Sequence, residues 1–348
     1  MKVLHLLQSN RFSGAENVAC QIIDMFSDES DVEMVYCSSD GQIRDALNER
    51  GIRFVPLRSF SVEEIKKVLK QEKPDLIHAH DMRASFYAAR ACGKTPLISH
   101  IHNNAFNSRG VSPKSVAYLW AAKKAKHIFW VSQSSYEGYA FHKFFSKKSS
   151  VLYNIIDIDA LYDKMNRDSN DYDYDVIYVG RLTYQKNPER LLGVIKLVVE
   201  KIPSVKIGIV GTGDLENQTK ALAEQYRLMD NVHFLGFQSN PLKMLHDSKV
   251  MIMTSRWEGT PMCALESLAL GTPIVSTPTD GLCELIKNGV NGFISDEDAD
   301  IAQCICELVS NKQECARVSD AARENAKKQN LKQPYKDMVA AVYQRANG

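Results

Sequence analysis

Short apolar runs alternate with segments of helical spacing along most of the chain. In the first half, helical spacing appears at 15–26 and 62–71, and strand-like runs appear at 3–8, 32–37, 76–80, 97–102 and 128–132. The second half repeats the pattern, with strands predicted at 176–182, 205–211, 232–235, 250–255 and 273–276 and helices at 188–201, 216–226, 241–246, 298–310 and 332–345. This alternation predicts an α/β protein with doubly wound, mostly parallel sheets. Ligands of such sheets bind at the carboxyl ends of the strands.

The length of the chain predicts two domains, because 348 residues exceed what a single hydrophobic core usually serves. Residues 162–175 are polar, acidic and almost free of aliphatic side chains, which is typical of an interdomain linker. We therefore expect a first domain over residues 1–165 and a second over 176–330. Residues 331–348 contain a last amphipathic helix.

Composition and charge exclude several classes of protein. The formal net charge of +1 gives no support for nucleic-acid binding, which favours a strong basic excess. No window holds about 18 consecutive apolar residues, so we expect no transmembrane helix and a cytoplasmic protein. The eight cysteines include no Cys-x-x-Cys pair, so we expect them to be reduced rather than zinc ligands.

The stretch at 250–271, VMIMTSRWEGTPMCALESLALG, carries the strongest local signal. Its apolar beginning at 250–255 predicts a buried strand, and a tight loop follows. Thr260 is expected to be the N-cap of a short helix, Pro261 its first residue, and Gly271 the residue just past its end.

The start of this helix predicts an anion site. The backbone amides of Met262 and Cys263 lack partners inside the helix, and the helix dipole adds to their attraction for a phosphate. Glu258 lies in the loop before the helix, and Glu266 lies about one and a half turns inside it. One carboxylate is thus placed to meet a reacting group and the other a more distant part of the ligand. The alternative is that both are solvated.

The segment EGTPMCALE resembles the E-x7-E signature of family 4 retaining glycosyltransferases. The resemblance implies the GT-B fold: two facing Rossmann-like doubly wound domains, the active site in the cleft, and the helix at 331–348 packing back on the first domain. The segment GRLTYQKN is similar to the family's G-R-L-x-x-x-K-N. It implies that Arg181 and Lys186 neutralise the leaving nucleoside diphosphate, so neither a metal ion nor another cofactor is expected.

The same resemblance assigns donor-binding residues in the second domain. Glu266 is expected to bind the ribose hydroxyls, and Glu258 is expected to position the sugar. The backbone around them is expected to hold the sugar and the diphosphate, through Gly259, Thr260, Pro261, Met262 and Cys263. The segments VGTGD and LGF imply that Gly211 and Gly213 border the donor pocket and that Phe237 lies at the base.

In the first domain, SGAE resembles the family's glycine-rich loop G-G-x-E, with Ser13 at the first glycine. The resemblance implies that Ser13, Gly14 and Ala15 line the space between the acceptor and the donor diphosphate. It also implies that His102 faces the transferred sugar, with Asn103 beside it on the acceptor side.

His78 and His80 share one face of the strand at 76–80, because side chains alternate along a strand. They are either a metal-binding pair without a third clear ligand or packed structural histidines. His100, two residues before His102, is expected to be structural.

We expect a retaining, metal-independent hexosyltransferase that uses a nucleotide-diphospho-sugar, a UDP-sugar by resemblance, and acts on a hydroxyl of a glycan or lipid-linked saccharide in surface polysaccharide synthesis. One rival is another GT-B enzyme, a nucleotide-sugar 2-epimerase or an inverting transferase. Its base in the first domain would be Asp81 or Glu16. The other rival is a non-catalytic nucleotide-sugar-binding module.

Two segments combine basic and aromatic residues, at 114–127 and 142–148. Such segments can lie on an anionic membrane surface, here the inner face of the cell membrane, or they can be solvated helix faces.

Overall fold

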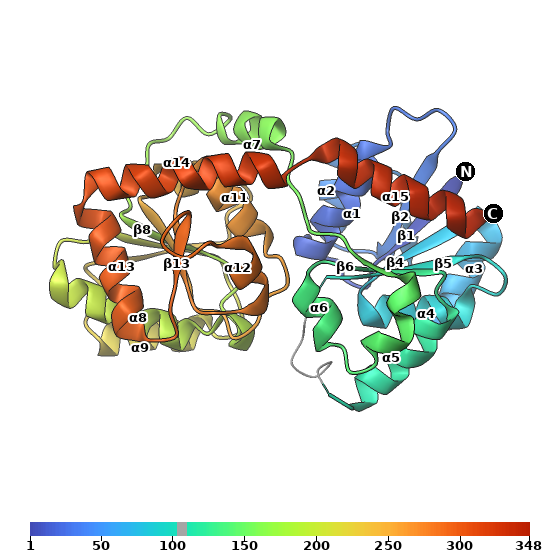
Figure 1. The fold of residues 1–348 in the computed structure, drawn as a ribbon, viewed down its shortest axis with the longest axis horizontal. Helices are drawn as coiled ribbons and strands as arrows, with labels where there is room; N and C mark the ends of the chain where they lie inside the picture. The colour runs from blue at the N-terminus through green and yellow to red at the C-terminus, as the bar shows by residue number, and fades with distance from the viewer. Residues whose placement is uncertain (103–109) are drawn as a thin grey trace. The chain divides into compact units, whose positions relative to one another are not determined.

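The computed structural model describes residues 1–102 and 110–348, which divide into two compact units (Figure 1). Unit 1 comprises Met1–Asn154 and Lys332–Gly348, and unit 2 comprises Ile155–Leu331. Each unit contains one parallel sheet with helices on both faces. The predicted pair of doubly wound sheets is therefore confirmed.

Unit 1 is built on a seven-stranded sheet of order β3-β2-β1-β4-β5-β6-β7. Its strands are β1 (Lys2–Leu6), β2 (Glu33–Ser39), β3 (Phe54–Leu57), β4 (Leu76–His80), β5 (Leu97–Ile101), β6 (His127–Trp130) and β7 (Ser149–Val151). Its helices are α1 (Gly14–Met25), α2 (Ile43–Glu49), α3 (Val62–Glu72), α4 (Asp81–Ala91), α5 (Pro113–Lys124), α6 (Gln133–Gly138), the 3₁₀ helix η2 (His142–Lys148) and α15 (Lys332–Asn347).

The two faces of this sheet differ in chemistry. Leu4, Leu6, Ile77 and Ala79 point to the face covered by α3, α4 and α5 and belong to the main hydrophobic core. The alternate positions of the same strands carry histidines on the opposite face. On that face α15 packs against β4, and the Tyr343 hydroxyl lies 2.7 Å from Nδ1 of His78.

Unit 2 has a six-stranded sheet of order β10-β9-β8-β11-β12-β13. Its strands are β8 (Val176–Val179), β9 (Ile207–Val210), β10 (Val232–Gly236), β11 (Val250–Met253), β12 (Ile274–Ser276) and β13 (Gly292–Ile294). Its helices are α7 (Ile158–Met165), η3 (Tyr184–Lys186), α8 (Pro188–Lys201), α9 (Glu216–Gln225), α10 (Leu242–Asp247), α11 (Met262–Leu270), α12 (Asp280–Leu285), α13 (Asp298–Ser310) and α14 (Lys312–Gln329).

The inner strands β8, β9 and β11 are buried on both faces, as expected of a parallel sheet covered by helices. Helices α8 and α13 pack together and supply the apolar side chains of one layer, and α11 packs against α14 (Figure 1).

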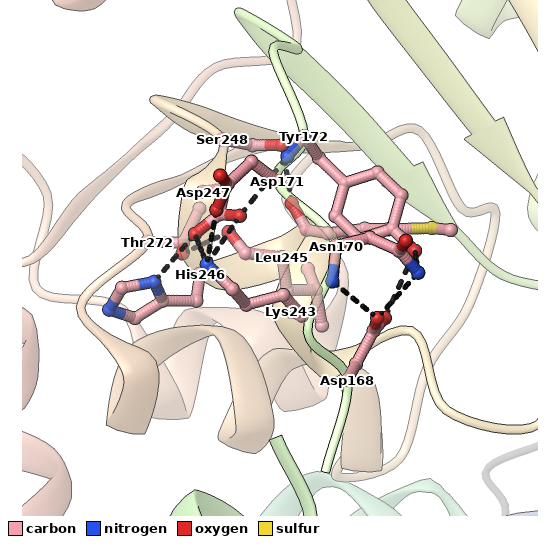
Figure 2. Close-up of polar contacts among 11 residues, drawn as sticks. Asp168, Asn170, Asp171, Tyr172, Lys243, Leu245, His246, Asp247, Ser248 and Thr272 are labelled. Carbon is pink, nitrogen blue, oxygen red and sulfur yellow. Dashed lines mark hydrogen bonds and ion pairs between the residues drawn. The ribbon is translucent and has the colours of Figure 1, made fainter. Parts of the chain in front are cut away.

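Residues 162–175 were predicted as an interdomain linker, but in the structure they belong to unit 2, where 162–165 end α7 and the rest runs beside α10 (Figure 2). The Tyr172 amide donates to Asp247 at 3.3 Å, and the Tyr172 hydroxyl donates to Asp168 at 3.0 Å. Lys243 donates to both carboxylate oxygens of Asp247 at 2.8 Å. The Tyr172 amide therefore joins the polar segment to α10, and the Tyr162 hydroxyl at its predicted start donates to the Ala269 carbonyl at 3.2 Å.

Candidate functional site

The strand order of unit 2 indicates where a ligand binds. The chain runs from β8 outward through β9 and β10, then crosses back so that β11 pairs with the other side of β8. In doubly wound sheets the crevice lies at this reversal, outside the carboxyl ends of the two central strands. The loops that follow β8 and β11 contain Arg181, Lys186 and Glu258, so the topology and the sequence motifs indicate the same place.

The two loops are joined by backbone and side-chain hydrogen bonds. The Arg256 amide donates to the Gln185 carbonyl at 2.8 Å, and the Gln185 side chain donates to the Trp257 carbonyl at 3.0 Å. The Thr254 hydroxyl donates to the carbonyl of Asn187 at 3.2 Å. The loop after β8 is therefore fixed in position relative to the loop after β11.

These loops bring together a buried ion pair. The Lys186 ammonium donates to Glu258 Oε1 at 2.6 Å, and the two side chains are 11% and 6% exposed. The Ser255 hydroxyl donates to the same oxygen at 2.6 Å. Burial lowers the pKa of Lys186, but the Glu258 carboxylate outweighs it and the pKa is raised above its usual value. Lys186 is thus a permanent cation, and Glu258 is oriented by two donors.

Arg181 directly follows Gly180 at the end of β8, and its side chain is exposed. Within the described residues no carboxylate pairs with its guanidinium. The group is available to an anion, as the motif predicts, and its role toward a ligand stays a prediction.

Helix α11 begins one residue later than predicted. Pro261, not Thr260, is the N-cap, with φ −71° and ψ 127°, and the helix starts at Met262. Pro261 has extended backbone and its carbonyl accepts from the Ala264 amide, while no side chain caps the helix. The predicted end is confirmed, since Gly271 adopts the left-handed φ of +81° past the last turn.

The amides of Met262 and Cys263 donate to no acceptor in the part of the chain that the structure describes. Burial raises the pKa of the Cys263 thiol to about 11, so this side chain adds no negative charge at the helix start. Glu266, further along α11, is half-buried, and burial raises its pKa. The helix start retains its free donors for an anionic ligand.

Close backbone contacts require both glycines of the VGTGD segment. Gly211 has φ +128°, and a Cβ on it would lie 2.0 Å from the Gly180 carbonyl oxygen. A Cβ on Gly213 would lie 2.2 Å from the Leu182 carbonyl oxygen. These residues let the loop after β9 lie directly against the loop after β8. Contact of Gly211 or Gly213 with the donor stays a prediction.

Phe237 follows the edge strand β10 and is 73% exposed. The preceding Gly236 has φ +63°, which turns the chain out of the strand. A large exposed aromatic ring is suited to stacking on a base, and this role also stays a prediction.

In unit 1 the strand order reverses between β1 and β4. The predicted glycine-rich loop follows β1, and His102 follows β5, the neighbour of β4. Ser13 is the N-cap of α1, but its hydroxyl donates to the Glu16 side chain and accepts from no backbone amide of the helix. Gly14 and Ala15 form the first turn of α1. The loop thus lies at the ligand-binding edge of its own sheet, as the motif predicts.

His102 lies at the carboxyl end of β5, where its amide donates to Asp81 Oδ1 at 2.9 Å. Asp81 itself has the left-handed φ of +70°, uncommon for a non-glycine residue. Burial lowers the pKa of His102 to about 3 and raises that of Asp81 to about 6. His102 is therefore a neutral hydrogen-bonding group at physiological pH. Asn103 lies outside the described residues.

Sequence reasoning missed two features of these sites. Ser255, the second donor to Glu258, belongs to an apolar run and carries no motif of its own. The contacts of His80 with His5 and His102 depend on β1, β4 and β5 being neighbours in the sheet. Only the order of parallel strands, which periodicity does not give, brings those rings together.

Comparison with known proteins places the chain in a family. Residues 12–160 match the family described as Glycosyltransferase Family 4, and residues 163–325 match Glycosyl transferases group 1. An uncharacterized glycosyltransferase of Methanocaldococcus jannaschii is 32% identical over 264 residues, which are 69% of this chain and 67% of that protein. The chain spans 61% of the length of a second relative from that organism.

A relative from Escherichia coli, UDP-Gal:alpha-D-GlcNAc-diphosphoundecaprenol alpha-1,3-galactosyltransferase, is 27% identical over 327 residues, which are 84% of each chain. Among solved structures, HepE of Anabaena in complex with UDP and glucose superposes with a TM-score of 0.86 at 22% identity, over 99% of this chain and 100% of that one. Both halves of the chain thus match one group of enzymes, and the paired parallel sheets match their architecture. The chain belongs to glycosyltransferase family 4 and has the GT-B fold.

Proposed function

We propose that the chain is a retaining glycosyltransferase that moves a hexose from a UDP-sugar to a hydroxyl of a lipid-linked saccharide in surface polysaccharide synthesis. The observation that carries this proposal is the buried Lys186–Glu258 pair next to the free amides that begin α11. A diphosphate needs cations and oriented N–H donors, and this loop pair supplies both. The activity for which the Escherichia coli relative is named, and the UDP and glucose in the HepE complex, support the choice of donor and acceptor.

In this mechanism the bond between the anomeric carbon and the diphosphate oxygen breaks, and the acceptor oxygen bonds to the same carbon from the same face. The acceptor proton passes to the departing phosphate oxygen. Lys186 and the amides of Met262 and Cys263 stabilise the charge that grows on the diphosphate. Arg181 adds an exposed guanidinium to the same group of donors.

Glu258 has a positioning role in this proposal. One carboxylate oxygen accepts from both Lys186 and Ser255, which fixes the group and leaves its other oxygen for a sugar hydroxyl. His102 is neutral and has one ring nitrogen, Nδ1, without a partner among the described residues. His102 is therefore suited to a hydrogen bond with a sugar hydroxyl and not to the role of a cation.

The rival enzymes need a free carboxylate base in the first domain. Asp81 accepts from the His102 amide, and Glu16 accepts from the Ser13 hydroxyl. Each therefore has a local structural role, which favours the retaining reaction.

Release of UDP from candidate UDP-sugars, measured with and without lipid-linked acceptors, tests the transfer itself. NMR of the product then gives its anomeric configuration. A product of inverted configuration would contradict the retaining mechanism, and donor binding without acceptor-dependent UDP release would favour the non-catalytic module.

We expect Glu266→Ala to weaken UDP binding about 10- to 100-fold, because a hydrogen bond to a charged group contributes about 1.5–3 kcal/mol. The half-buried Glu266 carboxylate is proposed to accept from the ribose hydroxyls. Isothermal titration with UDP measures the change. Glu224→Ala, on the exposed surface of α9, is the matched control and should bind UDP like the wild type. Equal affinities for the two variants would exclude the ribose contact.

We also propose that unit 1 binds anionic membranes through α5 and η2. The Lys148 ammonium donates to the carbonyls of Lys123 and Ala125 at 3.0 and 2.6 Å, so the basic ends of the two elements meet. Trp120 and Phe144 are 47% and 77% exposed on these elements. Within the described residues, every helix is too short or too polar to cross a bilayer. An interfacial contact of basic and aromatic side chains remains available.

Co-sedimentation with vesicles tests this contact. Wild-type protein is expected to bind vesicles containing anionic lipid and to lose binding at high salt. The double variant Trp120→Ala/Phe144→Ala should bind several-fold more weakly, because it removes the exposed aromatic area. Met229→Ala in unit 2 removes an exposed apolar side chain elsewhere and should leave binding unchanged. Equal binding to neutral and anionic vesicles would contradict the proposal.

A further inference from the structure

Five histidine rings gather on one face of the unit 1 sheet, a feature that the proposed transfer reaction leaves unexplained. They occupy alternate positions on three neighbouring strands, so they all lie opposite the main apolar core. The cross-strand partners are His5 with His78 and His80 with His100, and His102 follows at the end of β5. All except His102 are almost completely buried.

Hydrogen bonds account for only part of this cluster. His80 Nε2 lies 3.0 Å from His5 Nδ1, and His80 Nδ1 lies 2.8 Å from His102 Nε2. His78 Nδ1 lies 2.7 Å from the Tyr343 hydroxyl.

The remaining ring nitrogens have no partner in the described part of the chain. These are both nitrogens of His100, Nε2 of His5 and of His78, and Nδ1 of His102. A buried polar atom without a partner is costly, and such groups call for an unseen water or ion.

We propose that His80, His100 and His102 form a binding site for a transition-metal cation with the preferences of Zn²⁺. Their ligand atoms lie within 4.8 Å of one another. Imidazole suits this class of metal, and three neutral histidines with one open position are an established zinc arrangement. His100 would gain the partner that its ring otherwise lacks.

Two of the three ligand atoms already lie closer together than zinc would hold them, and the third must move to within bonding distance of the ion. Two nitrogens on one tetrahedral zinc are about 3.3 Å apart, given zinc–nitrogen distances of about 2.0–2.1 Å. His80 Nδ1 and His102 Nε2 are already 2.8 Å apart, so the ion replaces one hydrogen bond. The other nitrogen of His80 then donates to His5 Nδ1, the outer-shell contact that metal-binding histidines usually make.

A second group, His5, His78 and His80, has similar spacing. We favour the first group because it contains His100, both of whose ring nitrogens lack a partner among the described residues. His5 and His78 are fully buried, and His78 already has the Tyr343 hydroxyl as a partner. The bound ion would link β4 to β5 and has no part in holding the diphosphate.

Metal analysis of the full chain, purified without a histidine tag, tests the site. After removal of metal with a chelator and exchange into metal-free buffer, Zn²⁺ titration should show about one tight equivalent per chain. The unfolding temperature should rise with Zn²⁺ concentration. Co²⁺ should give the visible spectrum of a tetrahedral nitrogen site without the thiolate bands that cysteine ligands produce. Absence of a tight equivalent would overturn the proposal.

Two buried variants locate the site. His100→Phe keeps an aromatic ring and should abolish both the tight equivalent and the Co²⁺ spectrum. His78→Phe lies on the same face and should retain both. Loss in His78→Phe with retention in His100→Phe would overturn the assignment of the three ligands. If His100→Phe does not fold, His100→Gln and the wild-type stoichiometry still decide the matter, and equal metal binding by His100→Gln and wild type would count against the site.

Discussion

Replacing Lys186 with methionine is expected to lower kcat by about tenfold to a thousandfold, the scale for losing a donor that stabilises transition-state charge. The ammonium is buried, held 2.6 Å from Glu258, and next to the free amides of α11. Methionine keeps much of the apolar stem but removes the charge. The rate of UDP release at saturating donor and acceptor measures the effect.

The same substitution is expected to destabilise unit 2, because it leaves the Glu258 carboxylate buried without its cation. Breaking a buried ion pair in this way costs about 3–5 kcal/mol. The double variant Lys186→Met/Glu258→Gln removes both charges and should recover most of the stability but none of the activity. Wild-type turnover in a folded Lys186→Met protein would refute the role of the ammonium.

Gly281→Ala is expected to destabilise the protein by about 1–3 kcal/mol or more, the usual cost of inserting an atom where none fits. A Cβ on Gly281 would lie 1.2 Å from the carbonyl oxygen of Gly259, a backbone atom that no side-chain rotation can move. Helix α12 must therefore shift away from the loop that carries Glu258. Urea unfolding measures the stability, and isothermal titration measures the expected loss of UDP affinity.

Gly193→Ala is the matched control for this prediction. Gly193 lies inside α8, and a Cβ there meets no atom within 4 Å. Alanine at such a helix position should stabilise by about 0.5–1 kcal/mol and leave UDP binding unchanged. Similar losses of stability in both variants would show that the contact between α12 and the Gly259 carbonyl is not the cause.

The alternation of apolar and helical segments was sufficient to predict the fold class, because long buried strands such as β1 and β4 have clear patterns. The strands β3, β7 and β13 escaped the pattern, since each lies at the edge of its sheet and is only partly buried. The polar segment was predicted to be a linker because its composition is that of a linker. Its contacts with α10 involve residues distant in sequence, which the local pattern does not reveal.

The site was predictable where chemistry and local spacing coincide. Lys186 and Glu258 were identified from separate motifs, and the structure joins them in one ion pair. The start of α11 was misplaced by one residue, since both Thr260 and Pro261 are acceptable at a helix boundary. The close backbone contact of Gly281 with Gly259 depends on two loops meeting in space, and single-sequence patterns carry no information about it.

The return of α15 to unit 1 affects how this protein is made. The chain leaves unit 1 at Asn154 and re-enters it at Lys332, so the ribosome completes all of unit 2 before the last piece of unit 1 exists. Until α15 emerges, His78 lacks its Tyr343 partner and β4 lacks the helix that packs against it. An N-terminal fragment ending at 154 would keep that surface exposed permanently. Supplying residues 332–348 as a separate peptide is the simplest means of restoring it.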